Sequence, residues 1–414
     1  MKLKTTKVGA ILAAGALALS GVTVAASTVA GAAGKVPTYT IAFQGILSGG
    51  SAALGINEDN GVKLAVADWN ATATRKFNVK LISADDQGDP TVAPSIATQI
   101  ASNKKVVAVV GPSYSGATVA SIPVYGPSDM PIVSPSATRV SITQPDPTAT
   151  PPVVTPTNAK YKDFFRDVPN DNIQGPADGN YLAKTLAKKN IEVINDASSY
   201  GAGLASAVAA TAKADGATVT TATVPATTAC GNGGTGTNDQ VTIPSGITAV
   251  FFGGYYCDFA QITDIVRTAG YAGVLMSGDG SDDPHFMADL SKQSDGNGVL
   301  LTCACKAIVN TTAPGKKFNT GYQKLFKVQP GAYSAESYDA ANMIFAAMTK
   351  IHSVTRKNIT NELKKLSYVG ISKTITFTSS GDVKSKVINI YKVAVSTTPN
   401  GVSAVIKQVG TSTP

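Results

Sequence analysis

Short, unbroken hydrophobic runs recur along the chain, and small polar residues follow them. Two such runs, Val106–Val110 and residues 131–133, enclose a stretch at 117–125 that is long enough for one crossover helix. A β-branched run of this length is typical of a strand buried on both faces of a parallel sheet. The pattern therefore predicts a strand–helix–strand unit with Ser115, Ser136 and Thr138 just beyond its strand ends.

The same alternation of strand and helix continues along the chain. Further strands are expected at 39–43, 77–83, 191–195, 218–223, 249–252, 274–276 and 298–302. Helices are expected at 61–69, 91–103, 174–189, 203–215, 259–269, 318–327, 337–351 and 359–366. Residues 371–377 and 387–393, joined through 380–382, predict a closing β-hairpin. Sustained alternation of this kind predicts a doubly wound α/β protein.

A proline-rich stretch at 144–160 separates two such arrays, which indicates two lobes with a ligand cleft between their strand ends. The hydroxyls beyond the first-array strands can bind a carboxylate with help from a helix dipole. Serine and threonine at these positions are also ordinary caps of strand-to-helix turns, so this stretch alone does not establish a site.

The N-terminus predicts export. Lys2, Lys4 and Lys7 precede an apolar stretch at 8–26, and small residues near 24–26 and 30–32 suit a signal peptidase, so residues 1–33 are expected to be a signal peptide. An uncleaved membrane anchor is the alternative. The first cysteine is Cys230, so no lipid-modified N-terminal cysteine is expected, and the protein should be secreted or associated with the cell envelope.

The cysteines of an exported chain suggest disulfides. Cys230 lies in a glycine-rich loop and Cys257 follows a strand, and we expect these two to pair. Cys303 and Cys305 then remain as a strained local pair or as free thiols. A zinc site competes with this interpretation, but the Cys-x-Cys spacing lacks the usual spacer and the chain has only two histidines.

Charge and motifs exclude several classes of protein. The 35 basic and 27 acidic residues form no basic run, so a nucleic-acid partner is not expected. The sequence has no G-x-S-x-G elbow, no Walker loop and no G-x-G-x-x-G after a strand, and neither histidine is placed to activate a serine. These observations favour binding over catalysis, with no cofactor or metal.

The second array supplies groups that complement the serines and threonine of the first. Asp279 follows the expected strand at 274–276 and can accept from an ammonium, while Tyr255 offers an aromatic face. Carboxylate donors in one array and an acid in the other suit a zwitterionic amino acid, since pairing both charged ends makes their desolvation tolerable. Asp279 could instead cap a turn, and Tyr255 could be part of the core.

The sequence resembles the extracellular solute-binding proteins of branched-chain amino acid ABC transporters, the Leu/Ile/Val-binding-protein family with the type I periplasmic-binding fold. The resemblance covers about 39–393 and rests on an ordered set of motifs: VGPSYSG at 110–116, VSPSAT at 133–138, VPND at 168–171 with QG at 174–175, YGAGL at 200–204, FGGYY at 252–256, GDG at 278–280 and AESYDA at 335–340.

The resemblance implies two Rossmann-like lobes joined by a three-segment hinge. It places the N-terminal lobe at 38–160 and 304–372, the C-terminal lobe at 161–303 and 373–414, and crossings near 158–166, 301–306 and 370–374. Cys303 and Cys305 would then lie in a hinge strand, where a disulfide could stiffen it.

Position by position, the resemblance implies that Ser115 and Thr138 bind the ligand carboxylate. The carbonyl of Ser136, the ring of Tyr255 and the acid Asp279 would bind the rest of the head group. Further cleft candidates are Ser48, Leu54, Tyr114 and Tyr200. Many family members have Glu where Asp279 stands and an aromatic residue where Leu54 stands, which puts the ligand side chain in doubt.

The resulting hypothesis is a secreted receptor, expected to be a monomer, that captures a small, branched-chain amino acid and delivers it to an ABC permease. Alternatives are a sensor, a binder of amides, ureas or aromatic acids with the same fold, a secreted hydrolase, and an envelope protein with a vestigial cleft.

Overall fold

The computed structural model describes residues 36–149, 151–224, 241–306, 312–398 and 401–414, with the backbone alone described at 397–398 and 401–404. Met1–Val36 and Pro37–Pro414 are separate units, and the sheets and helices of the fold belong to the second. The expected signal peptide and Cys230 lie outside the described residues.

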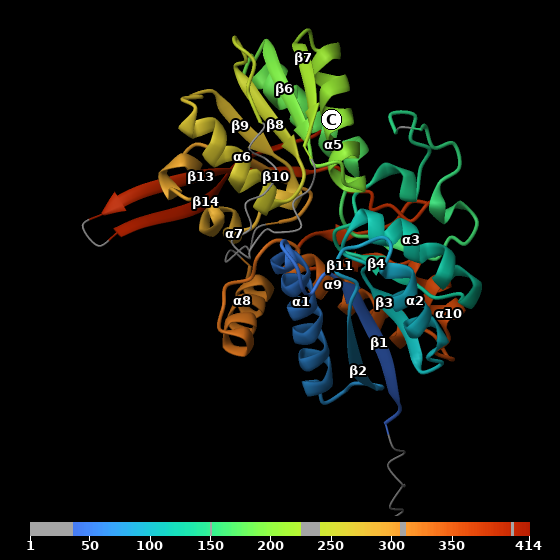
Figure 1. Ribbon diagram of the computed structural model, residues 1–414. Helices are drawn as coiled ribbons and strands as arrows, with labels where there is room; N and C mark the ends of the chain where they lie inside the picture. Colours follow the sequence, from blue (N-terminus) through green and yellow to red (C-terminus); the bar gives the residue numbers. More distant parts are fainter. Residues whose placement is uncertain (1–35, 150, 225–240, 307–311, 399–400) are drawn as a thin grey trace, which may run out of the picture. The chain divides into compact units, whose positions relative to one another are not determined.

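The first sheet has the strand order β2-β1-β3-β4-β5, and all of its strands are parallel (Figure 1). Its strands are β1 (Thr38–Gly45), β2 (Asn78–Asp85), β3 (Val106–Val110), β4 (Ile132–Ser134) and β5 (Phe164–Arg166). The associated helices are α1 (Ala52–Ala71), α2 (Ala93–Ser102), α3 (Ser115–Tyr125), α8 (Ala313–Phe326), α9 (Ser334–Lys350) and α10 (Arg356–Leu363). Residues late in the chain thus return to cover a sheet made by its first part.

Alternate residues of β1 face the two layers of helices. Ile41 and Phe43 belong to a cluster with Phe345 of α9, whereas Ala42 belongs to a cluster with Ile122 of α3. This alternation follows from the pleat, which directs successive side chains to opposite faces of the sheet. Full burial of each large apolar side chain contributes about 1.5–3 kcal/mol, so both helix layers stabilise the sheet.

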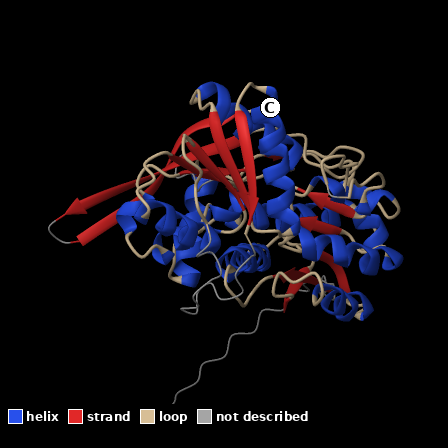
Figure 2. Ribbon diagram, turned by 45° about the horizontal axis from the view of Figure 1, so that its top comes forward, coloured by secondary structure: helices blue, strands red, loops and turns tan. Residues whose placement is uncertain are grey.

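The second sheet has the strand order β14-β13-β10-β9-β8-β6-β7. Its strands are β6 (Asn190–Asn195), β7 (Thr218–Thr223), β8 (Ala249–Gly253), β9 (Val274–Ser277), β10 (Leu300–Cys303), β13 (Ile388–Thr398) and β14 (Gly401–Ser412). The accompanying helices are α4 (Asp171–Asn180), the π-helical turn Tyr181–Thr185, α5 (Ser199–Ala214), α6 (Tyr256–Thr268) and α7 (Pro284–Asp289). Helices (blue) accompany strands (red) in Figure 2.

The two faces of the second sheet also carry different helices. Ile191, Val193 and Phe251 pack with Leu204 of α5, whereas Phe252 packs with Phe259 of α6 on the other face. The fold is therefore of the doubly wound α/β class that was expected, with helices on both faces of mostly parallel sheets.

The predicted closing hairpin is wrong in its pairing. The strand expected at 387–393 is β13, which pairs antiparallel with β14 and β10 and not with residues 371–377. Within 371–377, the short β12 (Thr374–Ile375) pairs with β11 (Tyr368–Val369), and Phe377 forms an isolated antiparallel bridge with Val383. The long ribbon of β13 and β14 extends beyond the rest of the sheet (Figure 1).

Helix α1 begins at Ala52, whereas the hydrophobic pattern predicts a start at 61. Its first turns contain Glu58 and Asp59, which are buried although both side chains are ionisable. Asp59 accepts a hydrogen bond from the Ser83 hydroxyl at 2.6 Å, so a distant partner makes the burial of this acid tolerable. The hydrophobic pattern of α1 contains no information about a partner such as Ser83, which lies in another element. Among the described residues, no helix combines the length and the apolar character needed to cross a membrane.

Candidate functional site

A small cavity lies where the loops that follow β3, β4, β8 and β9 meet. It leaves ≈ 20 Å³ for the centres of water molecules. Most of its lining comes from those loops and from α1, with additional residues from α5 and from the segment before α9. The lining residues are Leu54, Glu58, Ser113, Tyr114, Ser115, Ser136, Tyr200, Tyr255, Asp279, Gly280 and Tyr333. Both sheets therefore contribute residues to one site at the carboxyl ends of their strands.

The first sheet presents hydroxyl groups at the cavity. Ser115 is the first residue of α3 and is 2 % exposed, and its Oγ accepts from the backbone N–H of Arg139 at 3.2 Å. The Ser136 hydroxyl donates to the carbonyl of Ser113 at 2.7 Å. The Ser115 hydroxyl lies at the N-terminus of α3, where the dipole is positive, so it can donate to a carboxylate.

Thr138 is buried, but it is not among the lining residues of the cavity. Its Oγ1 has no hydrogen-bond partner of normal geometry among the described residues. The hydroxyl nevertheless lies close enough to the buried carboxyl of Asp171 to oppose the rise in its pKa, which burial brings to about 7. A ligand carboxylate that reached this hydroxyl would therefore compete with Asp171.

The second sheet presents a carboxylate that two tyrosines hold in place. The Tyr200 hydroxyl donates to Asp279 Oδ1 at 2.9 Å, and the Tyr333 hydroxyl donates to Asp279 Oδ2. Burial raises the pKa of Asp279, and these two donors oppose the shift. The hydrogen bonds orient the carboxylate at the cavity, where it can accept from an ammonium group.

Four tyrosines enclose the cavity. The rings of Tyr114 and Tyr255 are stacked with centroids 4.1 Å apart and planes 9° apart, and Tyr200 lies against Tyr255 at 5.3 Å. Tyr114 belongs to the loop after β3, whereas Tyr255 follows β8. The stack thus joins the loops of the two sheets directly over the site.

Glu58 is a cavity residue that the sequence pattern did not reveal. It is fully buried, and burial raises the pKa of its carboxyl to about 8. Its Oε2 accepts from the Ser113 hydroxyl at 2.7 Å, and the side chains of Ser113 and Ser136 both oppose the rise in its pKa. Ser113 lies in a strand-end loop that is conspicuous in the sequence, but nothing in the pattern of α1 distinguishes Glu58 from a solvent-exposed helix residue.

Of the further cleft residues predicted from the sequence, three line the cavity and one does not. Leu54, Tyr114 and Tyr200 line the cavity together with Ser115, Ser136, Tyr255 and Asp279. Ser48 does not, because it is exposed and its hydroxyl donates to Asp85 Oδ2 at 2.5 Å. Tyr333 was also missed, since it lies just before α9 with no periodic signal that marks it.

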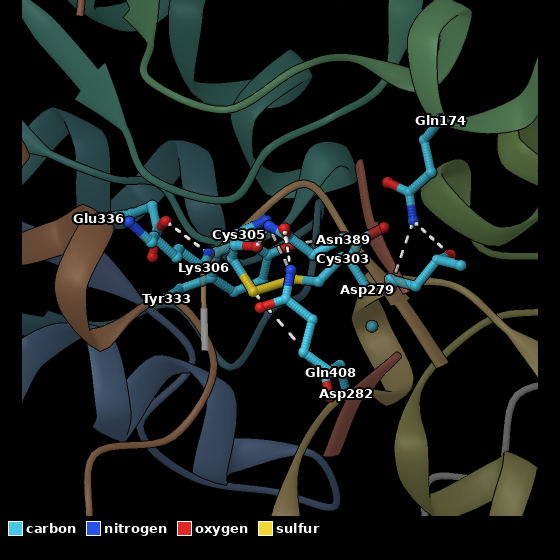
Figure 3. The surroundings of a disulfide bond; sticks show 12 residues. Gln174, Asp279, Asp282, Cys303, Cys305, Lys306, Tyr333, Glu336, Asn389 and Gln408 are labelled. Carbon is cyan, nitrogen blue, oxygen red and sulfur yellow. Dashed lines mark hydrogen bonds between the residues drawn. A yellow bond between two sulfur atoms is a disulfide. The ribbon is translucent and has the colours of Figure 1, made fainter. Parts of the chain in front are cut away.

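Cys303 and Cys305 form a disulfide at the end of β10, which Figure 3 shows beside Asp282 and Asn389. The Asn389 side chain donates to the carbonyl of Cys305 at 2.6 Å. A carboxylate oxygen of Asp282 lies 3.9 Å from Cys305 Sγ. Because the two sulfurs are bonded to each other, they are not thiolate ligands for a metal. Cys257 is also disulfide-bonded, and its expected partner Cys230 lies outside the described residues.

A buried ion pair ties together three connections between the elements of the two sheets. Lys373 Nζ donates to Glu336 Oε1 and to the carbonyl of Asp167, both at 3.1 Å. Glu336 Oε1 also accepts from the backbone N–H of Lys306 at 2.9 Å. These groups come from the segments that follow β5, β10 and β11, so one cluster of charges links the positions where the chain leaves one sheet for the other.

Comparison with known proteins identifies relatives of this chain. A leucine-, isoleucine-, valine-, threonine- and alanine-binding protein of Pseudomonas aeruginosa is 24 % identical over 361 residues, which cover 86 % of this chain and 90 % of the relative. The structure of a leucine-binding protein of Thermotoga maritima matches with a TM-score of 0.73 and 22 % identity, covering 90 % of this chain and 99 % of the other.

The branched-chain amino acid transporter substrate-binding protein of Streptococcus pneumoniae, solved in complex with isoleucine, matches with the same TM-score of 0.73, 22 % identity and the same coverage. These structures share the fold of this chain. The family model described as periplasmic binding protein matches residues 38–398. The chain therefore belongs to the periplasmic binding protein family.

Proposed function

We propose that this protein is an exported, non-catalytic receptor that captures a small aliphatic amino acid of the branched-chain group and delivers it to an ABC permease. The observation that carries the proposal is one cavity with a carboxylate-binding end and an ammonium-binding end. Ser115 stands at the first end and Asp279 at the second, and Ser136, whose carbonyl would accept from the ammonium, also lines the cavity. Related proteins support the same ligand class, since their names specify leucine, isoleucine, valine, threonine and alanine.

The carboxylate and the ammonium group of the ligand would each find complementary groups in the cavity. The carboxylate would accept from the hydroxyls of Ser115 and Thr138 beside the positive end of the α3 dipole. The ammonium would donate to Asp279, whose orientation the Tyr200 and Tyr333 hydroxyls maintain. A zwitterion loses its hydration in a cavity of this kind, and charge-assisted hydrogen bonds at both ends offset that loss.

Capture would proceed by closure of two lobes, with the lobe at 38–160 and 304–372 binding the ligand first. Contacts between the loops of the two sheets would stabilise the closed form. Asn57 Nδ2 donates to Asp283 Oδ2 at 2.8 Å, and the Tyr256 hydroxyl donates to the carbonyl of Gly50 at 3.1 Å. A ligand that contacts both lobes favours the closed form, and a permease can recognise the surface that closure creates.

Residues 1–33 would direct export, and without an N-terminal lipid the receptor would be free, wall-associated or held by an uncleaved signal. We propose a monomer in which Cys230 pairs with Cys257.

Calorimetry of the purified protein with each of the twenty amino acids tests the proposal. At least one aliphatic amino acid should bind more tightly than millimolar. Asp279→Ala should weaken that binding by about 3–5 kcal/mol, because it leaves a buried ammonium unpaired. The control Asp289→Ala removes an exposed acid outside the cavity and should bind as the parent does. If no amino acid binds, or if Asp279→Ala binds as tightly as the parent, the assignment is wrong.

A further inference from the structure

We propose that Tyr114 limits the size of the ligand side chain, so that among the branched-chain amino acids the site binds valine more tightly than leucine or isoleucine. This inference rests on the proposed function and narrows its ligand class. Ser115 and Asp279 cannot provide selectivity among amino acids, because they would contact only the head group that all amino acids share. The inference assigns that selectivity to the Tyr114 side chain.

The position of Tyr114 in the chain places its ring where a ligand side chain would begin. Tyr114 directly precedes Ser115 and is the N-cap residue of α3. Ser115, Asp279 and the Tyr114 ring line the same cavity. An amino acid whose head group is bound between Ser115 and Asp279 must therefore direct its side chain along the remaining wall, which the tyrosine rings and Leu54 form.

The space along that wall is small. The Tyr114 and Tyr255 rings contact face to face, with centroids 4.1 Å apart, so no aliphatic group fits between them. The cavity leaves ≈ 20 Å³ for the centres of water molecules, so little free space remains beside the two rings. Each additional methylene of a ligand must then displace a ring or hold the two lobes apart, and both changes sacrifice packing contacts.

Tyr114 is anchored in this position. Its hydroxyl donates to the carbonyl of Ser51 at 3.2 Å. Gly88 has a φ of +66°, and a Cβ at this residue would lie 2.6 Å from the Tyr114 ring, so the neighbouring turn accommodates the ring only because residue 88 is glycine. A bulky ligand would have to break the hydrogen bond and the stack together to move this side chain.

Calorimetry with alanine, valine and leucine on three proteins tests the inference. The parent should bind alanine or valine at least tenfold more tightly than leucine. Tyr114→Ala removes the ring and should raise the affinity for leucine relative to alanine at least tenfold. Tyr114→Phe retains the ring and should restore the ratio of the parent, because the ring and not the hydroxyl limits the space.

The possible results separate this inference from the proposed function. If the parent binds leucine as tightly as alanine, the function stands and the role of Tyr114 is refuted. The role is refuted equally if Tyr114→Ala leaves the ratio unchanged. If none of the three proteins binds any amino acid, both the function and the inference fail. If circular dichroism shows that Tyr114→Ala does not fold, the ratio of the parent's affinities for leucine and alanine still tests the inference, because equal affinities would refute it.

Discussion

The buried ion pair between Arg166 and Asp382 provides a sharp test of how this fold supports its site. The Arg166 side chain is fully buried, and its Nε donates to Asp382 Oδ1 at 2.7 Å. Its Nη1 donates at 2.8 Å to the carbonyls of Ala137 and Arg139, the two residues on either side of Thr138. The pair therefore stabilises the fold and holds the segment that carries a proposed ligand residue.

Asp382→Ala should lower the free energy of unfolding by about 3–5 kcal/mol, the usual cost of leaving one member of a buried pair without its partner. The Thr143 hydroxyl and the Gln144 amide, which both donate to Asp382 at 2.8 Å, would also lose their acceptor. Lys184→Met is the matched control: Lys184 pairs with Asp215 but is 62 % exposed, and such surface pairs contribute about 0–1 kcal/mol.

Urea denaturation of the purified proteins at pH 7 and at acid pH measures both effects. Burial acts to raise the pKa of Asp382, but the Arg166 guanidinium and the side-chain donors outweigh it, so the pKa is lowered. A lowered pKa stabilises the fold above the unfolded value of about 3.9, and this contribution is lost as the pH falls through the folded pKa. The difference between parent and Asp382→Ala should therefore shrink below about pH 3.9.

The reasoning would be refuted by an Asp382→Ala protein that is no less stable than Lys184→Met at pH 7. A difference that grows at acid pH would contradict the proposed charge pairing. A stable Asp382→Ala protein with unchanged ligand affinity would show that Arg166 is not needed to position residues 137–139.

Three further substitutions test individual features. The pKa of Glu58 is raised to about 8 in the folded protein, so the fold loses stability as the pH rises from about 4.5 through 8. Glu58→Gln should therefore reduce the fall in Tm between about pH 6 and about pH 9. An unchanged fall in Tm would contradict the raised pKa of Glu58. Lys373→Met leaves Glu336 buried without its ion-pair partner, so urea denaturation should show a loss of about 3–5 kcal/mol, whereas a loss below about 1 kcal/mol would mean that the connections between the two sheets do not depend on this pair. Gly111→Ala should cost at least about 1 kcal/mol, because Gly111 has a φ of +107° and an added Cβ would lie 2.1 Å from the Gln44 carbonyl; a Tm equal to that of the parent would contradict this.

Most strands of the two sheets could be predicted because local sequence determines them. Val106–Val110 and the run at 249–252 are unbroken apolar segments bounded by glycine, and such segments have few stable alternatives to a buried strand. Residues at their carboxyl ends were therefore identifiable too, and Ser115, Tyr255 and Asp279 all line the cavity.

The C-terminal ribbon was mispredicted because strand pairing is not a local property. Residues 387–393 read as a strand in either pairing, but β13 joins the second sheet through β10 and continues into β14. Its buried residues Ile388 and Tyr391 complete a hydrophobic cluster made by distant helices. Only that cluster decides between the two pairings.

The sequence by itself determined the α/β class and the polar residues after each strand, since both depend on local composition and periodicity. Tertiary structure alone decided that Glu58 and Tyr333 line the cavity and that Tyr114 stacks on Tyr255. These residues meet because α1 and α9 pack together on the first sheet while the loops of the second sheet approach them. Contacts between segments so far apart arise from the packing of whole elements, and no pattern within any one segment encodes them.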